Sequence, residues 1–305
     1  MNTSTFRTAV VRTPNGPGSI EIIDVPVVRP GPGQVRVGIA GAPVNPVDLG
    51  VADGFFHTIG LIDQPEYTGL GWEFAGTVLD SGPGVDLEIG TRVAGMVGGF
   101  DRDYGTYAEQ VVVPVAGLAV VPEGLDLVTA STLPVNGLAA VQMLDLLGDP
   151  PTDSHRLLVT GAAGAVGGYL LALAPERGWE VTGLARPEDE EFVRSLGARF
   201  APHAEPGWDA VADAASLQER ALEVVRDGGR FVGVKPNAVP AAERGISVSA
   251  VETRPDGARL GDLLVRAASG GLPARVHSVV PLEAAPDAHR AVAAGGVRGR
   301  YVLAP

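Results

Sequence analysis

The sequence predicts an α/β protein in which a β-rich region precedes a doubly wound parallel sheet. Residues 6 to about 128 contain short apolar segments separated by clusters of Gly and Pro, which is typical of a compact, barrel-like β domain. From Arg156 onward, apolar strands alternate with helical segments, as in a parallel sheet covered by helices. A glycine motif follows the first of these later strands, at the place where such sheets bind nucleotides.

The composition narrows the possible functions. The 305 residues are 45% apolar and 19% charged, as in an ordinary globular protein with a sizeable core. The net charge of −13 and the lack of Lys/Arg-rich runs argue against nucleic-acid binding. There are no cysteines, so disulfides, thiolate catalysis and cysteine metal ligands are excluded. No secretory signal and no apolar run of membrane-spanning length is evident, so we expect a cytoplasmic protein without a membrane partner.

The β-rich region contains six predicted strands. Each is a short apolar or alternating segment, and turn clusters such as those at 29–33 and 81–84 separate them. The predicted strands cover residues 9–12, 19–25, 34–40, 73–79, 92–97 and 108–113.

In the remainder of the chain, segments with the pattern of strands alternate with segments that have the periodicity of helices. A helix is predicted from about Leu133 to Gly148. Five strands then cover residues 157–160, 180–184, 210–213, 230–234 and 246–251, and four helices cover 165–177, 187–196, 217–226 and 258–268. A strand at 276–280, a helix at 282–294 and a strand at 301–303 end the pattern.

The glycine motif lies between the strand 157–160 and the helix 165–177. Glycines at three-residue spacing allow a sharp turn, close approach of a pyrophosphate and tight packing of the helix on the strand. The helix N-terminus also offers free N–H groups to the phosphates. The predicted cofactor residues of this turn are Thr160, Gly161, Ala162, Gly164, Ala165, Val166 and Gly167. The alternative is a tight strand-to-helix connection that binds nothing.

The end of the next strand favours NADP(H). An NAD site commonly has Asp or Glu there, about 20 residues after the motif, for the ribose hydroxyls. This strand instead ends in Arg186, whose guanidinium can make a bidentate contact with a 2′-phosphate. Acidic residues at 188–191 follow directly, so Arg186 can alternatively pair with them. Gly233, in the strand 230–234, is a further predicted cofactor residue.

Six motifs in the right order make the chain resemble the medium-chain dehydrogenase/reductase superfamily, and within it the zinc-free quinone oxidoreductase (zeta-crystallin-like) branch. The matching segments are Val-Asn-Pro-Val-Asp at 44–48, the block 69–78, Gly-Thr-Arg-Val at 90–93 with Gly-Thr-Tyr-Ala-Glu at 105–109, Val-Pro-Glu-Gly at 121–124, the glycine motif 161–167 and the closing segment 288–303.

The resemblance implies a Rossmann NADP-binding domain at 129–272, inserted into a GroES-like catalytic domain formed by 1–128 plus 273–305, with the active site in the cleft. Zinc members of the superfamily bind the metal through Cys and the His of Gly-His-Glu. This chain has no Cys and carries Trp72 at the position of that His, so no metal site is expected. The family's insert near 198–209 is short here, so we expect one helix to be missing.

The resemblance also proposes residues for the reaction. Asn45 would bind the substrate carbonyl or the nicotinamide ribose, or alternatively stabilise the turn before Pro46. Tyr67 and Tyr104 are candidate proton donors, or packed tyrosines with satisfied hydroxyls. Phe55 and Phe56 occupy the region where related enoyl reductases often carry a Tyr, so solvent is an alternative proton source.

Further residues complete the candidate set. Asn136 and Arg300 are predicted to face the cofactor, Arg300 in place of a frequent Lys, whereas Ala139 replaces a Thr that would contact the cofactor. Asp48 is interpreted as a structural first-turn acid. His57, the only histidine near the expected cleft, is more typical of a surface or packed residue than of a catalyst.

These expectations give a function. Without a Lewis acid, nothing stabilises a developing alkoxide, whereas a conjugated acceptor delocalises the charge of an added hydride into an enolate. We therefore expect zinc-independent, NADPH-dependent reduction of a small-molecule enone or quinone. The alternatives are a tailoring enzyme of a biosynthetic pathway with redox-neutral chemistry, and a non-catalytic NADPH-binding sensor or scaffold. A homodimer is expected through the strand 246–251.

Overall fold

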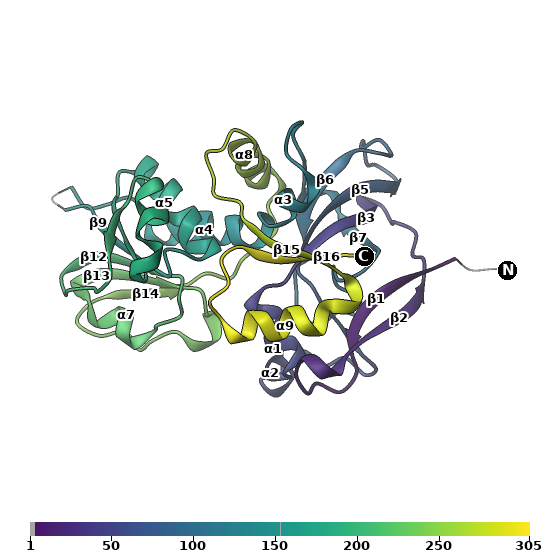
Figure 1. Cartoon of the computed structure of the whole chain (residues 1–305), viewed down its shortest axis with the longest axis horizontal. Coiled ribbons are helices and arrows are strands. Elements are labelled where there is room, and N and C mark those ends of the chain that lie inside the picture. Colours follow the sequence, from purple (N-terminus) through teal and green to yellow (C-terminus); the bar gives the residue numbers. More distant parts are fainter. Residues whose placement is uncertain (1–3, 153) are drawn as a thin grey trace. The chain divides into compact units, whose positions relative to one another are not determined.

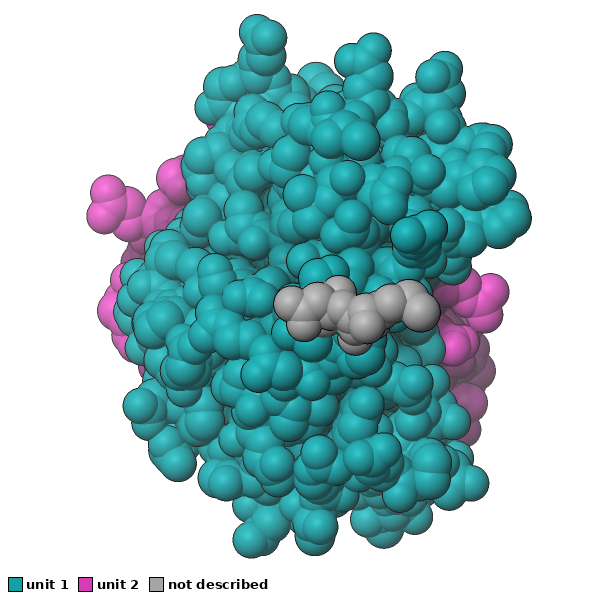
Figure 2. Space-filling view, turned by 90° about the vertical axis from the view of Figure 1, so that its right-hand side faces the viewer, with its two compact units in different colours: residues 1–135, 255–269, 274–305 teal, residues 136–254, 270–273 magenta. Residues whose placement is uncertain are grey.

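The computed structural model describes residues 4–152 and 154–305. The chain divides into two compact units (Figure 1). The first consists of residues 1–135, 255–269 and 274–305, which are teal in Figure 2. The second consists of residues 136–254 and 270–273.

The first unit is built on two sheets. A seven-stranded sheet has the order β15 (Val276–Pro281), β16 (Arg300–Ala304), β3 (Gln34–Pro43), β5 (Glu73–Ser81), β6 (Arg92–Met96) and β8 (Leu118–Val120), with β7 (Gln110–Pro114) also paired to β3. A smaller sheet has the order β2 (Ile20–Pro26), β1 (Thr5–Val11) and β4 (Thr68–Gly69). The first unit therefore confirms a β-rich domain to which the closing segment of the chain adds two strands.

Short helices surround these sheets. They are α1 (Pro46–Ala52), α2 (Phe55–Thr58), α3 (Leu127–Ser131), α8 (Gly257–Ala268) and α9 (Ala285–Ala294), with 3-10 turns at Pro17–Ser19, Val115–Gly117 and Leu282–Ala284. The core forms because alternate residues of β3, such as Val35 and Val37, point inward and are fully buried. Leu282 and Leu303, from the closing segment, are buried in the same cluster.

The second unit is a six-stranded parallel sheet with helices. The strand order is β11 (Arg199–Ala201), β10 (Glu180–Leu184), β9 (Arg156–Thr160), β12 (Trp208–Asp213), β13 (Val225–Gly233) and β14 (Ser247–Ala250). The order 3-2-1-4-5-6 is that of a Rossmann sheet. The helices are α5 (Ala165–Leu173), α6 (Glu190–Ser195), α7 (Glu219–Glu223) and α4 (Pro134–Leu147), which starts in the first unit; 3-10 turns cover Ala174–Arg177, Pro187–Asp189 and Pro236–Ala238.

Several local features differ from the sequence prediction. The pattern did not predict α2, α3, β4, β8 or β11, because these elements are too short to show a period. The helix α1 was anticipated only through the interpretation of Asp48 as a first-turn helix acid. Residues 202–207 connect β11 to β12 without a helix, and that the family's longer insert has lost a helix here stays a prediction. The predicted helix 217–226 is shortened to α7, and β13 starts five residues earlier than the predicted strand 230–234.

The two units also divide the chain differently from the boundaries predicted at 128 and 273. Residues 255–269 belong to the first unit because α8 packs against β8. A Cβ at Gly257 would lie 2.2 Å from the carbonyl oxygen of Leu118, so only Gly allows this close approach. No helix among the described residues is long and apolar enough to cross a membrane.

Candidate active site

The glycine turn of the second unit has the geometry of a phosphate cradle. It follows β9, and Gly161 has a φ of 58°, the left-handed conformation that favours Gly. A Cβ at Gly167 would lie 2.2 Å from the Gly161 carbonyl oxygen, so the turn closes against α5 only without a side chain there. Gly164 is the N-cap of α5 and Ala165 and Val166 form its first turn, which directs free N–H groups outward. These residues fit the pyrophosphate of a dinucleotide.

A buried carboxylate holds the cradle to the neighbouring strand. The Thr160 hydroxyl at the end of β9 donates to Asp213 Oδ1 at 2.6 Å and accepts from the Ala215 amide at 3.0 Å. Asp213 also accepts from the Leu217 and Gln218 amides at 3.1 and 2.8 Å. Asp213 ends β12, next to β9, where the strand order of the sheet reverses. Asp213 was not among the predicted site residues, although an acid at the carboxyl end of the predicted strand 210–213 was a visible signal.

Arg186 lies just beyond β10, on the other side of β9 from β12. Its side chain is 60% exposed, and its Nη1 lies 3.6 Å from Glu188 Oε1. An exposed pair at this distance is weak, so the guanidinium remains available to a phosphate. Ala162 adjoins the same strand through a 3.2 Å hydrogen bond from its amide to the Leu184 carbonyl, and Gly233 ends β13.

The first unit contains a buried polar network around Asn45. The Asn45 amide group donates to Glu73 Oε1 at 2.7 Å and accepts from Arg300 Nη2 at 2.7 Å. Glu73 Oε2 accepts from the Val135 amide at 2.7 Å. Asn45 and Glu73 are almost completely buried. The structure thus brings two predicted residues, Asn45 and Arg300, into direct contact, with Glu73 as an additional member.

Asp48 extends this network. Its carboxylate accepts from the Asn45 and Gly71 amides at 2.8 and 3.0 Å and hydrogen-bonds the Tyr107 hydroxyl. The Tyr107 hydroxyl lies 3.3 Å from His289 Nε2, which α9 positions. Asp48 is therefore not only an acid in the first turn of α1, as predicted, but also the residue that joins several buried groups of the network. The sequence analysis did not propose Tyr107 or His289.

Burial controls the protonation of these groups. Desolvation raises the pKa of Glu73 to about 7, and the positive charge of Arg300 opposes this rise. Desolvation likewise raises the pKa of Asp48 to about 6. Desolvation lowers the pKa of Arg102, whose charge acts on Asp48, to about 10. Desolvation also lowers the pKa of His289 to about 4, so His289 is neutral at pH 7. The Tyr107 pKa lies well above its ordinary value for the same reason.

Tyr67 and Tyr104 form a separate group. Their hydroxyls lie 3.3 Å apart, and Arg12 stacks 5.3 Å from the Tyr67 ring centroid. The hydrogen bond to Tyr104 raises the pKa of Tyr67 to about 12. Tyr104 also packs edge-on against Phe6 at 6.1 Å. Their role as proton donors stays a prediction.

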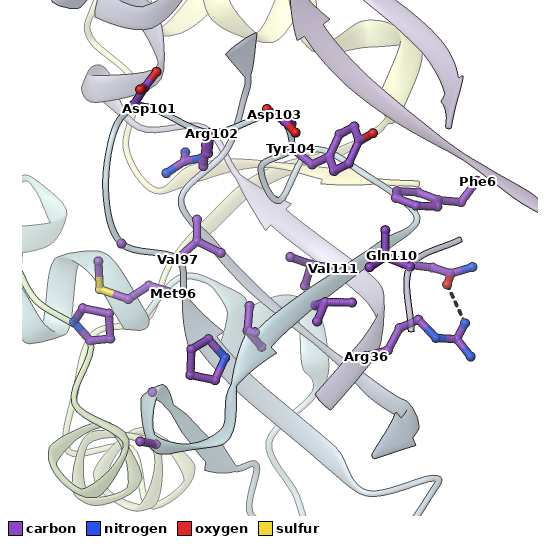
Figure 3. A pocket seen from close by; sticks show the side chains of 18 of the residues that line it. Phe6, Arg36, Met96, Val97, Asp101, Arg102, Asp103, Tyr104, Gln110 and Val111 are labelled. Atoms are coloured by element: carbon purple, nitrogen blue, oxygen red, sulfur yellow. Dashed lines mark hydrogen bonds between the residues drawn. The ribbon is translucent and has the colours of Figure 1, made fainter. Parts of the chain in front are cut away.

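Tyr104 lies on the wall of a cavity of about 850 Å³ in the first unit, large enough for an organic ligand (Figure 3). β7 forms one side of it, and the segment from Met96 to Gly98 contributes another part of the lining. Arg36, on β3, also lines the cavity, and its Nη1 donates to Oε1 of Gln110 on β7 at 2.7 Å. The rest of the lining combines apolar residues such as Phe6 and Pro255 with the charged segment Asp101 to Asp103, so the cavity suits a molecule with both apolar and polar parts.

The residues do not fit a zinc centre. The sequence has no Cys, and the described residues contain no group of three or more His, Asp or Glu side chains that could hold a metal ion. His57 instead faces Thr68, with 3.1 Å between Nε2 and Oγ1, and desolvation lowers its pKa. Asn136 is buried near the start of α4.

Comparison with known proteins agrees with this fold. A model described as "Alcohol dehydrogenase GroES-like domain" matches residues 31–123, and one described as "Zinc-binding dehydrogenase" matches residues 190–303. A quinone oxidoreductase from Coxiella burnetii has a similar fold, with a TM-score of 0.85 and 22% identity over 99% of this chain and 100% of that chain.

Two curated relatives are similar in sequence. The "NADPH-dependent alkenal/one oxidoreductase, chloroplastic" of Arabidopsis thaliana is 29% identical over 71% of this chain and 58% of its own length. The "Pikromycin polyketide synthase component PikAII" of Streptomyces venezuelae is 33% identical over 70% of this chain. The match spans only 6% of that synthase's length.

Proposed function

Because the chain belongs to the medium-chain dehydrogenase/reductase superfamily, we propose that it is a zinc-independent oxidoreductase that uses NADPH to reduce a conjugated C=C bond or a quinone. The observation that carries the cofactor assignment is the cradle at Gly161–Gly167, which a Cβ at Gly167 would fill. The named activity of the Arabidopsis relative supports both the acceptor and the cofactor.

The residues have distinct roles in this proposal. Thr160 to Gly167 hold the pyrophosphate, with Asp213 fixing Thr160. Arg186 binds the 2′-phosphate by a charge-assisted hydrogen bond. NADPH, when bound, supplies the hydride. Asn45 is oriented by Glu73 and Arg300 and positions the reacting partners, which contributes through orientation. Asn136 and Gly233 complete the proposed cofactor contacts.

The polyketide synthase relative supports a role in a biosynthetic pathway. The alternative in which such a tailoring enzyme uses the fold for redox-neutral chemistry stays open. Turnover of a pathway substrate without NADPH consumption would support it. A homodimer through β14 is also proposed, because β14 is an edge strand of the parallel sheet with one side unpaired by strands of the described chain. A monomer in solution would contradict the dimer.

The decisive experiment is a titration of the purified protein with NADPH and NADH, followed by 1,4-naphthoquinone and 4-phenylbut-3-en-2-one. We expect selective NADPH binding and loss of its absorbance with one or both acceptors. Binding without oxidation would favour a sensor or scaffold, and binding of neither cofactor would contradict the proposal entirely.

A further inference from the structure

One edge of strand β7 forms a wall of the cavity of about 850 Å³ in the first unit. All residues of β7, Gln110–Pro114, line this cavity, although successive residues of a strand point their side chains to opposite faces of the sheet. Both sets reach the cavity because it lies beside the strand and not over one face. Figure 3 shows β7 along the cavity, with Met96 and Val97 on the opposite side.

One end of the pairing between β3 and β7 fixes the direction of the main chain at Gln110. The Glu109 carbonyl accepts from the amide of Ile39, in β3, at 2.9 Å. In a planar trans peptide, the carbonyl of one residue and the N–H of the next point in opposite directions. The Gln110 N–H therefore points away from β3, toward the other edge of β7.

The opposite end of the pairing has the same arrangement. The Val115 amide donates to the Gly33 carbonyl at 2.9 Å, so the Pro114 carbonyl also points away from β3. Bonded and non-bonded residues alternate along an antiparallel pair, and this pair runs without a register shift. Val112, midway between the two ends, therefore directs both its N–H and its carbonyl away from β3. The N–H groups of Gln110 and Val112 and the carbonyls of Gln110, Val112 and Pro114 thus lie on the edge that β3 does not use.

No other strand of the described chain occupies this edge. Among the described strands, only β3 pairs with β7. β1 reaches the chain just before β7, where Thr8 forms an isolated bridge with Ala108, and the pairing ends there. Phe6, in β1, lines the cavity. A sheet edge that presents donors and acceptors at two-residue spacing is a template for one further strand.

The two arginines of the lining are held by acceptors of the protein itself. Arg36 Nη1 donates to Gln110 Oε1 at 2.7 Å, and its Nη2 lies 3.6 Å from Asp80 Oδ2. Arg102 Nη2 donates to the Gly71 carbonyl at 2.6 Å. Both guanidinium groups are therefore engaged, which argues against an anionic ligand.

The acidic residues of the lining favour a ligand of the opposite charge. Asp101 and Asp103 both line the cavity and are exposed. Asp101 Oδ1 accepts from the Asp63 amide and from Gln64 Nε2, both at 3.0 Å, and these neutral donors leave its charge in place. Apolar residues such as Met96 complete the lining. A ligand with basic and apolar side chains is complementary to such a surface.

We propose that the cavity binds an extended peptide segment of another protein, which adds a strand to the free edge of β7. The peptide N–H groups donate to the carbonyls of Gln110, Val112 and Pro114, and the peptide carbonyls accept from the N–H groups of Gln110 and Val112. A segment of about five residues covers this edge, which is about 17 Å long. Basic side chains of the peptide face Asp101 and Asp103. The site lies wholly within the first unit, so it does not depend on the proposed reaction.

Calorimetric titration with synthetic peptides tests the proposal. The probes are acetylated and amidated pentapeptides of the pattern Lys-X-Thr-X-Lys, in which X is Val, Leu or Phe. We expect at least one of them to bind, and its counterpart with Glu in place of Lys to bind more weakly. If none of the three binds at about 1 mM, the proposal is wrong.

Peptides with N-methyl groups provide a control that needs no variant of the protein. Two versions of the tightest probe are methylated on alternate residues, so that each version loses the N–H groups of one edge and keeps every side chain. One version should bind at least about tenfold more weakly, because it loses the hydrogen bonds to β7, whereas the other should bind like the parent peptide. Equal binding of both versions and the parent would show that the peptide main chain does not pair with β7.

Amide hydrogen exchange locates the bound peptide. The amides of Val111 and Val113 are bonded to β3 and should exchange slowly with or without peptide. Those of Gln110 and Val112 should exchange at least about tenfold more slowly at saturating peptide. Binding without this protection would place the peptide elsewhere and overturn the proposal. Protection of both amides in the absence of peptide, lost on dilution, would show that a second copy of the chain occupies the edge instead.

Two variants at one position test the contact from the side of the protein. Val112→Pro removes the central N–H of the free edge, and a sheet accepts Pro where the N–H is not bonded to a neighbouring strand. Val112→Ala keeps this N–H and is the matched control. We expect peptide binding to weaken about tenfold in Val112→Pro and to stay within about threefold of the wild type in Val112→Ala. Equal affinities of the folded variants would contradict the proposal.

Discussion

The two candidate sites of this molecule are built by opposite means. The cradle in the second unit depends on missing side chains, since Gly167 leaves room for a backbone carbonyl 2.2 Å from where its Cβ would be. The Asn45 network in the first unit depends on buried side chains whose charges and hydrogen bonds must balance. The first should therefore be sensitive to added volume and insensitive to pH. The second should respond to charge and to proton concentration.

The largest effect is expected from Gly167→Ala. The added methyl collides with backbone that has no freedom to move, so the turn must open, and we expect the NADPH dissociation constant to rise by about 100-fold or more. Fluorescence titration with NADPH measures this, with circular dichroism to follow folding. Gly261→Ala, where the new Cβ meets nothing closer than 3.9 Å, is the control and should bind NADPH normally. Unchanged affinity in Gly167→Ala would remove the steric account of the cradle.

Glu73→Gln should expose the charge dependence of the other site. It replaces an acceptor of the Asn45 and Val135 N–H groups by an amide with one oxygen, so a buried donor loses its partner at a cost of about 1–3 kcal/mol. Chemical denaturation measures the change in the free energy of unfolding. A variant as stable as the wild type would show that the Glu73 contacts are not important for stability.

The same variant tests the pH dependence. The Glu73 pKa is about 7 in the folded state against an ordinary value of 4.5 in the unfolded chain, so between these values the folded protein binds the additional proton. Its contribution to stability is therefore complete below about pH 4.5 and is lost as the pH rises through about 7. Asp48, with a pKa of about 6 against 3.8, acts in the same direction. We expect the wild-type melting temperature to fall between pH 5 and 8, and this fall to be smaller in Glu73→Gln.

Arg186→Ala should have an intermediate effect confined to the cofactor. Loss of one charge-assisted contact with a 2′-phosphate should weaken NADPH binding about tenfold and leave NADH binding unchanged. Glu188→Gln removes the competing ion pair at 3.6 Å and should strengthen NADPH binding slightly. Equal weakening for both cofactors would show that Arg186 does not contact the 2′-phosphate.

The smallest effect is expected at Ser216, in the turn that Asp213 holds. Its φ of 56° is strained for a residue with a Cβ. Ser216→Gly should raise the free energy of unfolding by about 0.5 kcal/mol, because relief of strain is partly offset by the freedom of Gly in the unfolded chain. Gly270→Ala, at a φ of 78°, should change stability in the opposite direction. Thermal melts of both variants check the sign.

The same contrast explains what the sequence could predict. The cradle is a local structure, so Thr160 to Gly167 carry their signal in eight consecutive residues. The polar network joins residues far apart in the chain, and only Asn45 and Arg300 were proposed for it. Tyr107 and His289 have no local pattern, because their importance arises from a contact across 182 residues. Glu73 lay within a quoted motif, but nothing in the motif indicated that it would be buried against Asn45.

The segmented first unit has a consequence for how the protein is made. Arg300 and Asn45, which share a 2.7 Å hydrogen bond, are 255 residues apart. At a synthesis rate of about 5–20 residues per second, more than about ten seconds therefore pass between the synthesis of Asn45 and that of Arg300. The whole second unit is synthesised in that interval and can fold as an independent parallel sheet. The cofactor cradle can thus exist on the nascent chain before the Asn45 network is complete.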